Sequence, residues 1–470
     1  MKNNFIQSSL IYFLGTVLLR GISFLTLPIY TRIMLPEEYG LYSLFTASLS
    51  IVTIFVGFQI QGSVNLTYNT KSEEEFDTYV ANISLFPLLI LIISLLLLLI
   101  VPQLTITLRV PSVLFSIMMF IQAYFGVVIN IYMSELIIKK RPKKHLVVSI
   151  ITTILNVVLS VSFVLMFTDH SYFAMVIAGV IANLIIVIYI FFKYIFRIQL
   201  SSLKEDWKYG LRLSLPLIFH VLSHQVLNVA DRFMLEKYQT EIQVAIYSVV
   251  YSIGAIIQMI WSAINNAWIP WYFENLKESS HKMIRLYSKQ YIIFFSIGTV
   301  LFLLISPEIT LILGGKQYYS GVNSVPLIIL AYFFVFLYSF YVNYEFAKEK
   351  TILIPLATIL AAIINIILNI YFIPRYGYLG ASLTTAISYF LMLMFHYFVV
   401  VNVMKHRDFP DYYTWLSIVA ILIGMSITYV FLDEVIIRVL IFIMIMLGYG
   451  GYVFYLLKKS NIIKNFKYDK

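Results

Sequence analysis

One arginine, Arg20, lies within the first long apolar stretch of the chain, in the segment GTVLLRGISFL at residues 15–25. A guanidinium group stays charged in proteins, and its planar fork of donors fits phosphate oxygens. A cation at the centre of a membrane-spanning helix costs roughly 2.5–3.5 kcal/mol, so it normally faces protein or water. We therefore predict that Arg20 lines a cavity and binds an anionic head group. A structural ion pair or hydrogen bond to a neighbouring helix is the alternative.

Basic and amide side chains also recur at every fourth position near the middle of the chain, where a helix would place them on one face. Two of them are histidines, which can release a proton near neutral pH or donate hydrogen bonds between helices. On the first apolar stretch, Thr16 lies one helical turn before Arg20. We predict that the two sets face each other across a cleft. The second set consists of His220, His224, Asn228 and Arg232.

A third candidate is a short segment rich in tryptophan and asparagine, WSAINNAWIPW at residues 261–271. A sugar needs planar apolar faces and amide or hydroxyl partners, which Trp268, Asn265 and Asn266 could supply. We predict that this segment forms a rim facing a glycan. Arg32, near the outer end of a predicted helix, is a further candidate for substrate binding, although snorkelling or a local pair would also explain an arginine there.

The elements that position these residues are helices in a membrane. Of the 470 residues, 61% are hydrophobic and 12% are charged, whereas soluble domains carry about 25% charged residues. The chain has no cysteine, which excludes disulfides and thiolate metal sites. Its seven histidines lack a metal-ligand spacing such as HExxH. We expect no cofactor and no metal site.

Apolar runs of about 20 residues, long enough to cross a bilayer, recur along the whole chain. They predict an all-α polytopic membrane protein with about 14 transmembrane helices, the first of them retained rather than cleaved as a signal peptide. An even number of spans would place both termini on one side. The predicted helices lie near 9–29, 41–61, 82–101, 112–137, 146–167, 171–192, 211–228, 244–268, 288–305, 325–345, 352–372, 378–400, 413–432 and 436–457.

Lysine and arginine alternate between the predicted loops in a way that supports this topology. The loops on the side of the termini carry 23 of the 33 basic residues, and the loops on the opposite side carry 7. The positive-inside rule then predicts that both termini are cytoplasmic. Topology and anionic inner-leaflet lipid explain the net charge of +10, so no nucleic-acid partner is expected.

Two halves of the chain can be aligned with each other. YTRIMLPEEYGLYSL at 30–44 resembles ADRFMLEKYQTEIQVAIYSV at 230–249, and SELIIKK at 134–140 resembles YEFAKEK at 344–350. Six helices in each copy would keep the copies in one orientation, which predicts two six-helix bundles related by a pseudo-two-fold axis along the membrane normal. The predicted parts are an N-terminal bundle at 1–200, a C-terminal bundle at 201–403, and two additional helices with a basic tail at 404–470.

Several polar residues of the predicted helices are expected to have structural roles. The second alignment superimposes Glu135 and Glu345 near the inner ends of helices and close to lysines, which favours ion pairs. Asn365 and Asn369 are expected to hydrogen-bond between helices. Asp231 is expected at the outer end of a helix, as a local pair with the arginine that follows it. No carboxylate is expected deep in the membrane.

Three stretches resemble signatures of one transporter family. They are LPIYTRIMLPEEYGLYSLF at 27–45, LGGKQYYSGVNSVPLIIL at 313–330 and YFIPRYGYLGASLTTAISYF at 371–390. They are similar to the first loop, the loop before helix 10 and the turn between helices 11 and 12 of the polysaccharide transporter family. That family comprises lipid-linked oligosaccharide flippases, in the superfamily that includes multidrug and toxin extruders. With the predicted span count, the resemblance covers essentially the whole chain.

The resemblance implies a multi-pass protein of the bacterial inner membrane, not an enzyme, that moves undecaprenyl-pyrophosphate-linked glycans outward. The glycans would serve O-antigen, capsule or teichuronic-type polymers. It also implies two bundles that open alternately to each face around a cavity lined by cations. The implied partners are the lipid-linked glycan, membrane lipids, a proton or sodium ion for coupling, and a polysaccharide polymerase.

Other functions are weighed against this one. A cation-coupled multidrug exporter usually needs buried carboxylates, which the sequence does not predict deep in the membrane. A lipid II-type flippase remains an alternative, because it would need the same pyrophosphate chemistry. A membrane glycosyltransferase or polymerase would need a large polar loop or an acidic catalytic pair, and the only acidic cluster is KSEEEFD at 71–77.

Overall fold

The computed structural model describes residues 24, 26–101, 103 and 112–459. Arg20, Thr16 and most of the predicted first span lie outside the described residues. In the described part every regular element is a helix, which confirms the all-α prediction. The main elements are α2 (Pro36–Gly57), α3 (Gly62–Thr67), α4 (Glu73–Ile100), α6 (Val113–Ile138), α7 (Pro142–Met166), α8 (Ser171–Tyr194), α9 (Leu203–Tyr238), α10 (Glu241–Lys277), α11 (His281–Gly314), η3 (Lys316–Ser324), α12 (Val325–Ala347), α13 (Leu353–Phe398), α14 (Asp411–Val430) and α15 (Val435–Lys459).

Most of the predicted spans coincide with these helices. Among the described residues, 11 helices are long and apolar enough to cross a membrane, or up to 12 if the bent helix α9 is one span. The two parts of α9, Leu203–Phe219 and Val221–Tyr238, differ in direction by 43°. Since the first predicted span lies mostly outside the described residues, the total of fourteen stays a prediction.

Helix α13 contains the two spans predicted at 352–372 and 378–400. The hydroxyl of Thr384 donates to the side chain of Asn369, 15 residues earlier. A straight helix would separate such residues by about 22 Å, so the chain folds back between them. The turn is at Gly377, whose φ of 53° is in the left-handed region, and a Cβ there would lie 2.1 Å from Gln243 Oε1. Only glycine suits this position.

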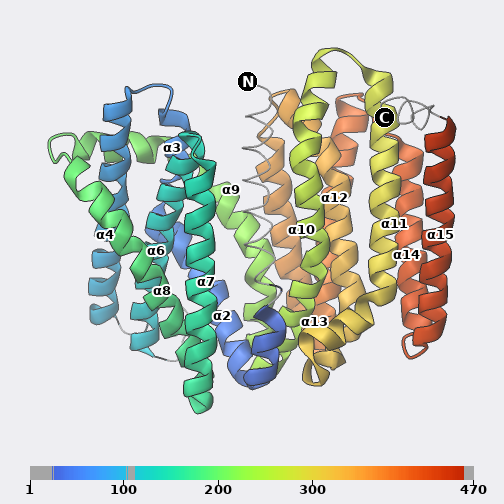
Figure 1. Cartoon of the computed structure of the whole chain (residues 1–470), viewed down its shortest axis with the longest axis horizontal. Coiled ribbons are helices and arrows are strands. Elements are labelled where there is room, and N and C mark those ends of the chain that lie inside the picture. Colours follow the sequence, from blue (N-terminus) through green and yellow to red (C-terminus); the bar gives the residue numbers. More distant parts are fainter. Residues whose placement is uncertain (1–23, 25, 102, 104–111, 460–470) are drawn as a thin grey trace, which may run out of the picture.

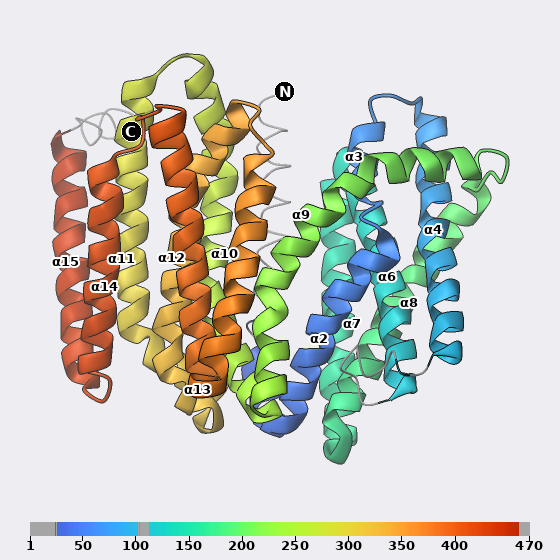
Figure 2. The same ribbon diagram turned by 180° about the vertical axis from the view of Figure 1, so that it is seen from behind.

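The helices form two groups (Figure 1). Helices α4, α6, α7 and α8 form one group, and α10 to α15 form the other. Helices α2 and α9 run obliquely between the groups, because α2 packs against both α6 and α10 while α9 packs against α4 and α13 (Figure 2). The basic loops at 139–144, 277–285 and 405–407 share the upper face of Figure 1, where α15 also ends. This arrangement agrees with the predicted charge alternation.

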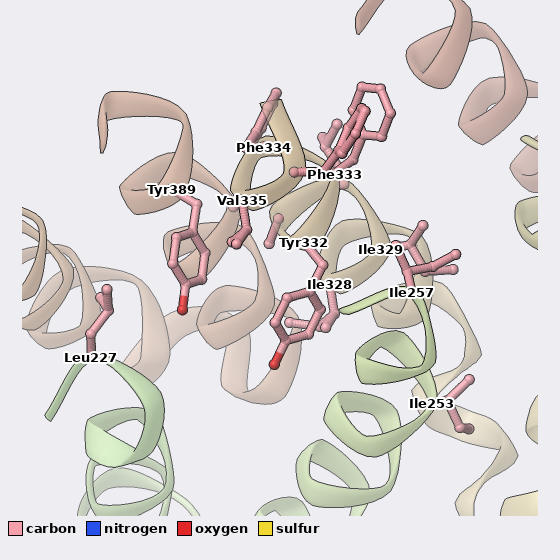
Figure 3. Close-up of a cluster of buried hydrophobic side chains, with 14 of the residues drawn as sticks. Leu227, Ile253, Ile257, Ile328, Ile329, Tyr332, Phe333, Phe334, Val335 and Tyr389 are labelled. Carbon is pink, nitrogen blue, oxygen red and sulfur yellow. The ribbon is translucent and has the colours of Figure 1, made fainter. Parts of the chain in front are cut away.

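The second group has a large aromatic core centred on α12. Within an apolar 18-residue stretch of the span that contains α12, 89% is buried inside the protein. The corresponding share for α6 is 39%. Figure 3 shows Ile253 and Ile257 of α10 beside Ile328 and Ile329 of α12, with Tyr389 of α13 on the other side. In a membrane such cores are held by close van der Waals packing rather than by a hydrophobic effect between helices.

A buried arginine joins the two C-terminal helices, α14 and α15, to α11. Arg438 of α15 is 2% exposed and makes two hydrogen bonds to Glu308 of α11, at 2.6 and 2.8 Å. It also donates to the carbonyl oxygen of Leu304 at 2.6 Å. A bidentate arginine to carboxylate pair is the stronger kind of charged hydrogen bond, so it fixes the position of α15 on α11.

Candidate functional site

A polar pocket of about 400 Å³ lies where the oblique helices α2 and α9 meet α6 and α8 of the first group. Its volume is within the range of roughly 300–1,000 Å³ that is common for small-molecule sites. No charged side chain is among the described residues that line it. We call it the amide pocket, since its polar lining consists of Gln59, Gln61, Gln122, Asn130, Asn183 and Gln225, with the hydroxyl groups of Thr46, Ser50 and Thr53.

Helical spacing brings these side chains to one place. On α6, Gln122, Gly126 and Asn130 are four residues apart and therefore share a face. At the end of α2, Phe58 has φ of 47° and Gln59 has φ of 54°, a left-handed C-terminal turn. This turn breaks the helix and places Gln59 at the wall of the pocket.

The pocket has spare hydrogen-bonding capacity. Gln225 Nε2 of α9 donates to Ser50 Oγ of α2 at 2.7 Å, which links the two oblique helices. Gln61 Nε2 donates to Gln59 Oε1 at 2.8 Å. The oxygens Gln61 Oε1 and Gln122 Oε1 are buried and have no protein partner. An unsatisfied buried acceptor costs about 1–3 kcal/mol, so both oxygens favour a hydroxyl or amide donor in the pocket.

The predicted polar face of α9 exists. Asn228 Nδ2 and His224 Nδ1 are 3.0 Å apart, and Arg232 Nη1 donates to the carbonyl oxygen of Asn228 at 3.1 Å. His224 is exposed and directly precedes Gln225, which lines the amide pocket. His220 lies in the same helix, but its side chain is outside the described part of the structure.

Arg232 is already engaged by neighbouring side chains of α10. Its Nε donates to Ser248 Oγ at 3.1 Å, and its guanidinium lies 5.0 Å from the ring centre of Tyr251. Tyr251 in turn donates to Asn228 Oδ1 at 3.1 Å, as does Tyr389 at 3.2 Å. The half-buried guanidinium keeps its charge and is held at a fixed position beside the polar face of α9.

Asp231 is not at the end of a helix, where the sequence places it, but is buried within α9 among neighbouring helices. The residue is 0% exposed and accepts hydrogen bonds from Tyr247, from Thr385 at 2.7 Å and from Asn369 at 2.5 Å. Among the described residues, no lysine or arginine forms a direct ion pair with Asp231, and the guanidinium of Arg232 donates to Ser248 instead. The prediction failed because α9 continues to Tyr238, which places Asp231 about two turns inside the helix.

The predicted rim on α10 does not form one surface. Asn266 is exposed, whereas Trp268 is 9% exposed and packs against Trp271 and Tyr291, with ring centres 4.9 and 5.3 Å away. Asn265 is half-buried, and its Oδ1 has no protein partner. None of the three lines the amide pocket.

Arg32 and Thr31 connect the first predicted helix with α11. Arg32 is exposed, and its Nη2 donates to the carbonyl oxygen of Ile312 at 2.9 Å. Thr31 Oγ1 donates to the carbonyl oxygen of Leu313 at 2.7 Å, and Gln317 Nε2 donates to the carbonyl oxygen of Thr31. We call these contacts the lower seam, since they lie at the face of Figure 1 where α2 begins. Two of the three family-like motifs, 27–45 and 313–330, therefore meet here.

The two aligned glutamates form the expected structural pairs. Glu135 of α6 is 1% exposed and bonds to Lys193 of α8 at 2.5 Å and to Tyr194 at 2.7 Å. Glu345 of α12 is 0% exposed and bonds to His396 of α13 at 2.9 Å. The partner of Glu345 is thus a histidine rather than a lysine. The first pair joins α6 to α8, and the second joins α12 to α13.

The amide pocket is the feature that the sequence analysis missed. One signal was present, because Gln122 and Asn130 are eight residues apart in the largely apolar middle of a predicted helix. Polar residues inside transmembrane helices usually face the bundle interior or a cavity. That signal could have marked α6, but not the helices that complete the pocket with it.

Comparisons with known proteins extend this description. The family described as "Polysaccharide biosynthesis protein" matches residues 5–276. A Haemophilus influenzae protein named for the Lsg locus is 24% identical over 424 residues, which is 82% of this chain and 97% of that protein.

Two solved structures show the same fold. The lipid II flippase MurJ in an inward closed conformation has a TM-score of 0.72 at 17% identity, covering 95% of this chain and 99% of that one. An inward-facing multidrug resistance transporter of the MATE family has a TM-score of 0.62 at 14% identity, covering 81% of this chain and 95% of that one. The chain therefore has the fold that these two membrane transporters share.

Proposed function

The chain belongs to the family of polysaccharide biosynthesis proteins, and from this premise we propose that it is a flippase for undecaprenyl-pyrophosphate-linked oligosaccharides. It would carry repeat units from the cytoplasmic to the outer face of the bacterial inner membrane for the synthesis of a surface polysaccharide, such as O-antigen or capsule. A fold shared with membrane transporters supports a transport function rather than an enzymatic one.

The observation that carries the proposal is the amide pocket. Six amide and three hydroxyl side chains line an open pocket of about 400 Å³ in a chain of membrane-spanning helices. A lipid chain or an organic cation would not satisfy such a lining, because amides and hydroxyls need partners that both donate and accept hydrogen bonds. A sugar ring with several hydroxyl groups meets this need. Glycan translocation therefore explains why a membrane protein keeps so many neutral polar side chains together.

The pyrophosphate would be held by cations near the pocket. Arg232 is fixed at the polar face of α9, and His224 lies about two turns of the helix closer to the pocket. Arg20 is proposed as the main clamp, because a guanidinium in the first helix offers a bidentate site for phosphate oxygens. The undecaprenyl tail would remain in lipid.

Movement would follow alternating access between the two bundles, 1–200 and 201–403. In this proposal the upper face of Figure 1, with its basic loops, is cytoplasmic. The coupling ion, a proton or sodium, would act at Asp231, because this fully buried carboxylate is surrounded by hydroxyl and amide groups without a paired cation among the described residues. A polysaccharide polymerase would receive the exported repeat unit.

One experiment tests the function directly. Cells depleted of the protein should accumulate one undecaprenyl-pyrophosphate glycan, which mass spectrometry of extracted lipids would identify and vesicle sidedness assays would place on the cytoplasmic face. Arg20→Ala should abolish export while protein level and insertion persist, and Arg20→Lys should restore it only in part. Unchanged lipid pools after depletion would reject the proposal.

Two alternatives keep specific support. The buried carboxylate of Asp231 is the kind of group that a cation-coupled multidrug exporter needs, and a MATE transporter shares the fold. Altered drug sensitivity without accumulated glycan lipids would favour that function. The likeness to a lipid II flippase favours a lipid II-type cargo instead, and accumulation of that lipid would identify it.

A further inference from the structure

The charge of the residues that line the amide pocket bears on which ligand the pocket can bind. Its polar lining is uncharged throughout the described residues, although the chain carries 33 lysines and arginines and 23 aspartates and glutamates. On the neighbouring part of α9, Arg232 donates to Ser248, and Asp231 accepts from Tyr247 and Thr385. From the described residues that line the pocket, a ligand therefore meets dipoles and no counter-ion.

Resting on the proposed function, we propose that the amide pocket binds an uncharged sugar of the transported glycan and discriminates against acidic sugars. The recognised class would be neutral hexoses and N-acetylated amino sugars. Uronic acids and other carboxylate-bearing sugars would be rejected at this subsite.

The first step is the fit of a neutral sugar to the free groups of the pocket. Gln61 Oε1 and Gln122 Oε1 are buried acceptors without a protein partner. A sugar hydroxyl or an acetamido N–H can donate to each of them, which removes the cost of an unsatisfied acceptor. The amide nitrogens on the other side chains supply donors in return.

The second step is the penalty for an acidic sugar. A carboxylate can only accept hydrogen bonds, so it cannot satisfy the two free amide oxygens and would repel them. The carboxylate would also lose its hydration in the pocket without gaining a cation as a partner. Burying an unpaired charge in this way is costly in free energy. The arginine on α9 does not offset this loss, because its guanidinium is held away by Ser248 and the ring of Tyr251.

The third step is the rigidity of the lining, which limits how far the pocket could rearrange for a charged guest. Gln122 lies against Gly179 of α8, where a Cβ atom would come within 2.6 Å of its Nε2. Gln225 is tied to Ser50 at 2.7 Å, and Gln61 to Gln59 at 2.8 Å. These contacts fix the direction of the amide groups before the ligand binds.

The test uses three synthetic lipids that differ only in the head group: undecaprenyl pyrophosphate, the same lipid with one glucose, and the same lipid with one glucuronic acid. Binding to the full-length protein in nanodiscs would be measured by competition. The glucose lipid should bind about tenfold or more tightly than the glucuronate lipid, the size expected when a charged group is left without a partner. Gln122→Lys should abolish or reverse this preference.

Gln290→Lys is the matched control, since Gln290 is an exposed amide on α11 outside the pocket, and it should leave the preference unchanged. Gln122→Leu serves if the lysine variant does not fold, and it should lower the affinity for the glucose lipid toward that of the sugar-free lipid. Equal affinity of the two sugar lipids would overturn the inference while leaving the flippase function intact. Failure to bind or transport any of the three lipids would instead reject the proposed function.

Discussion

Helices α6 and α12 correspond to each other in the predicted repeat, yet their central residues differ in kind. Both carry a buried glutamate near the upper face, Glu135 and Glu345, each bonded to a basic side chain. Counted back from these glutamates, the residues of α6 that line the amide pocket are Gln122, Gly126 and Asn130, and the residues of α12 at the same positions are Tyr332, Phe336 and Phe340.

The difference separates two tasks. In α6 a Cβ on Gly126 would meet nothing within 4 Å, whereas in α12 Phe336 is 0% exposed and packs against Phe295 with ring centres 4.2 Å apart. At these positions the first group has a polar pocket, whereas the second group has a closely packed aromatic core. Under the proposed function, the first group would hold the cargo and the second would provide a rigid body against which the first moves.

The largest expected effect comes from making α6 resemble α12 at its centre. Gly126→Phe places a ring in the amide pocket and should reduce glycan-lipid transport in proteoliposomes below detection. The open space around this glycine and the higher helix propensity of phenylalanine should keep the protein stable.

Gly298→Phe is the matched control, since Gly298 of α11 is exposed and its Cβ would also meet nothing within 4 Å. It should transport normally. If the Gly126 variant also transports normally, the pocket does not hold the cargo.

The reverse change, emptying the centre of α12, should affect stability rather than the cargo site. Phe336→Ala leaves a cavity in the aromatic core and should cost roughly 3–5 kcal/mol, seen as a lower melting temperature of the purified protein in detergent. Phe294→Ala is the control, because Phe294 is 52% exposed. A melting temperature equal to that of the wild type would contradict the rigid role of α12.

The two glutamate pairs should differ in strength. Glu135→Gln leaves Lys193 without its carboxylate partner, a loss of about 3 kcal/mol for a largely buried charge. Glu345→Gln keeps an amide that can still hydrogen-bond to the ring of His396, so the loss should be nearer 1 kcal/mol. The melting temperatures of both purified variants would test this difference. Equal shifts would mean that the two pairs contribute equally to stability.

The smallest effect is expected at the link between the oblique helices. Gln225→Leu removes the 2.7 Å hydrogen bond from α9 to Ser50 of α2 and one polar group of the pocket. Transport should fall about fivefold, the equivalent of one net hydrogen bond of about 1 kcal/mol. A rate unchanged from the wild type would remove Gln225 from the cargo site.

Much of the fold was predictable because each span is a local signal. A long apolar run specifies a membrane helix by itself, and the PRYG segment specifies the turn at Gly377. Asp231 was misplaced because the predicted helix ended near 228, whereas α9 continues to Tyr238. A helix boundary in a polar stretch carries little hydropathy signal.

The amide pocket could not be predicted, because it depends on contacts between distant segments. Ser50, Gln122, Asn183 and Gln225 come from four helices, and each alone resembles a polar side chain that joins helices. The sequence indicated the face of α9 correctly, since His224, Asn228 and Arg232 are on one helix. It did not indicate that α2, α6 and α8 meet beside that face.

In the proposed transport cycle, the lower seam would set how often the molecule opens at that face. Three hydrogen bonds, from Thr31, Arg32 and Gln317, cross between the first predicted helix and the region of α11 and η3. At about 1 kcal/mol each, they bias a two-state equilibrium so that on the order of one molecule in a hundred is open there without cargo. A cargo that binds the open state more tightly would raise this population, so turnover would depend on that difference in affinity rather than on affinity alone.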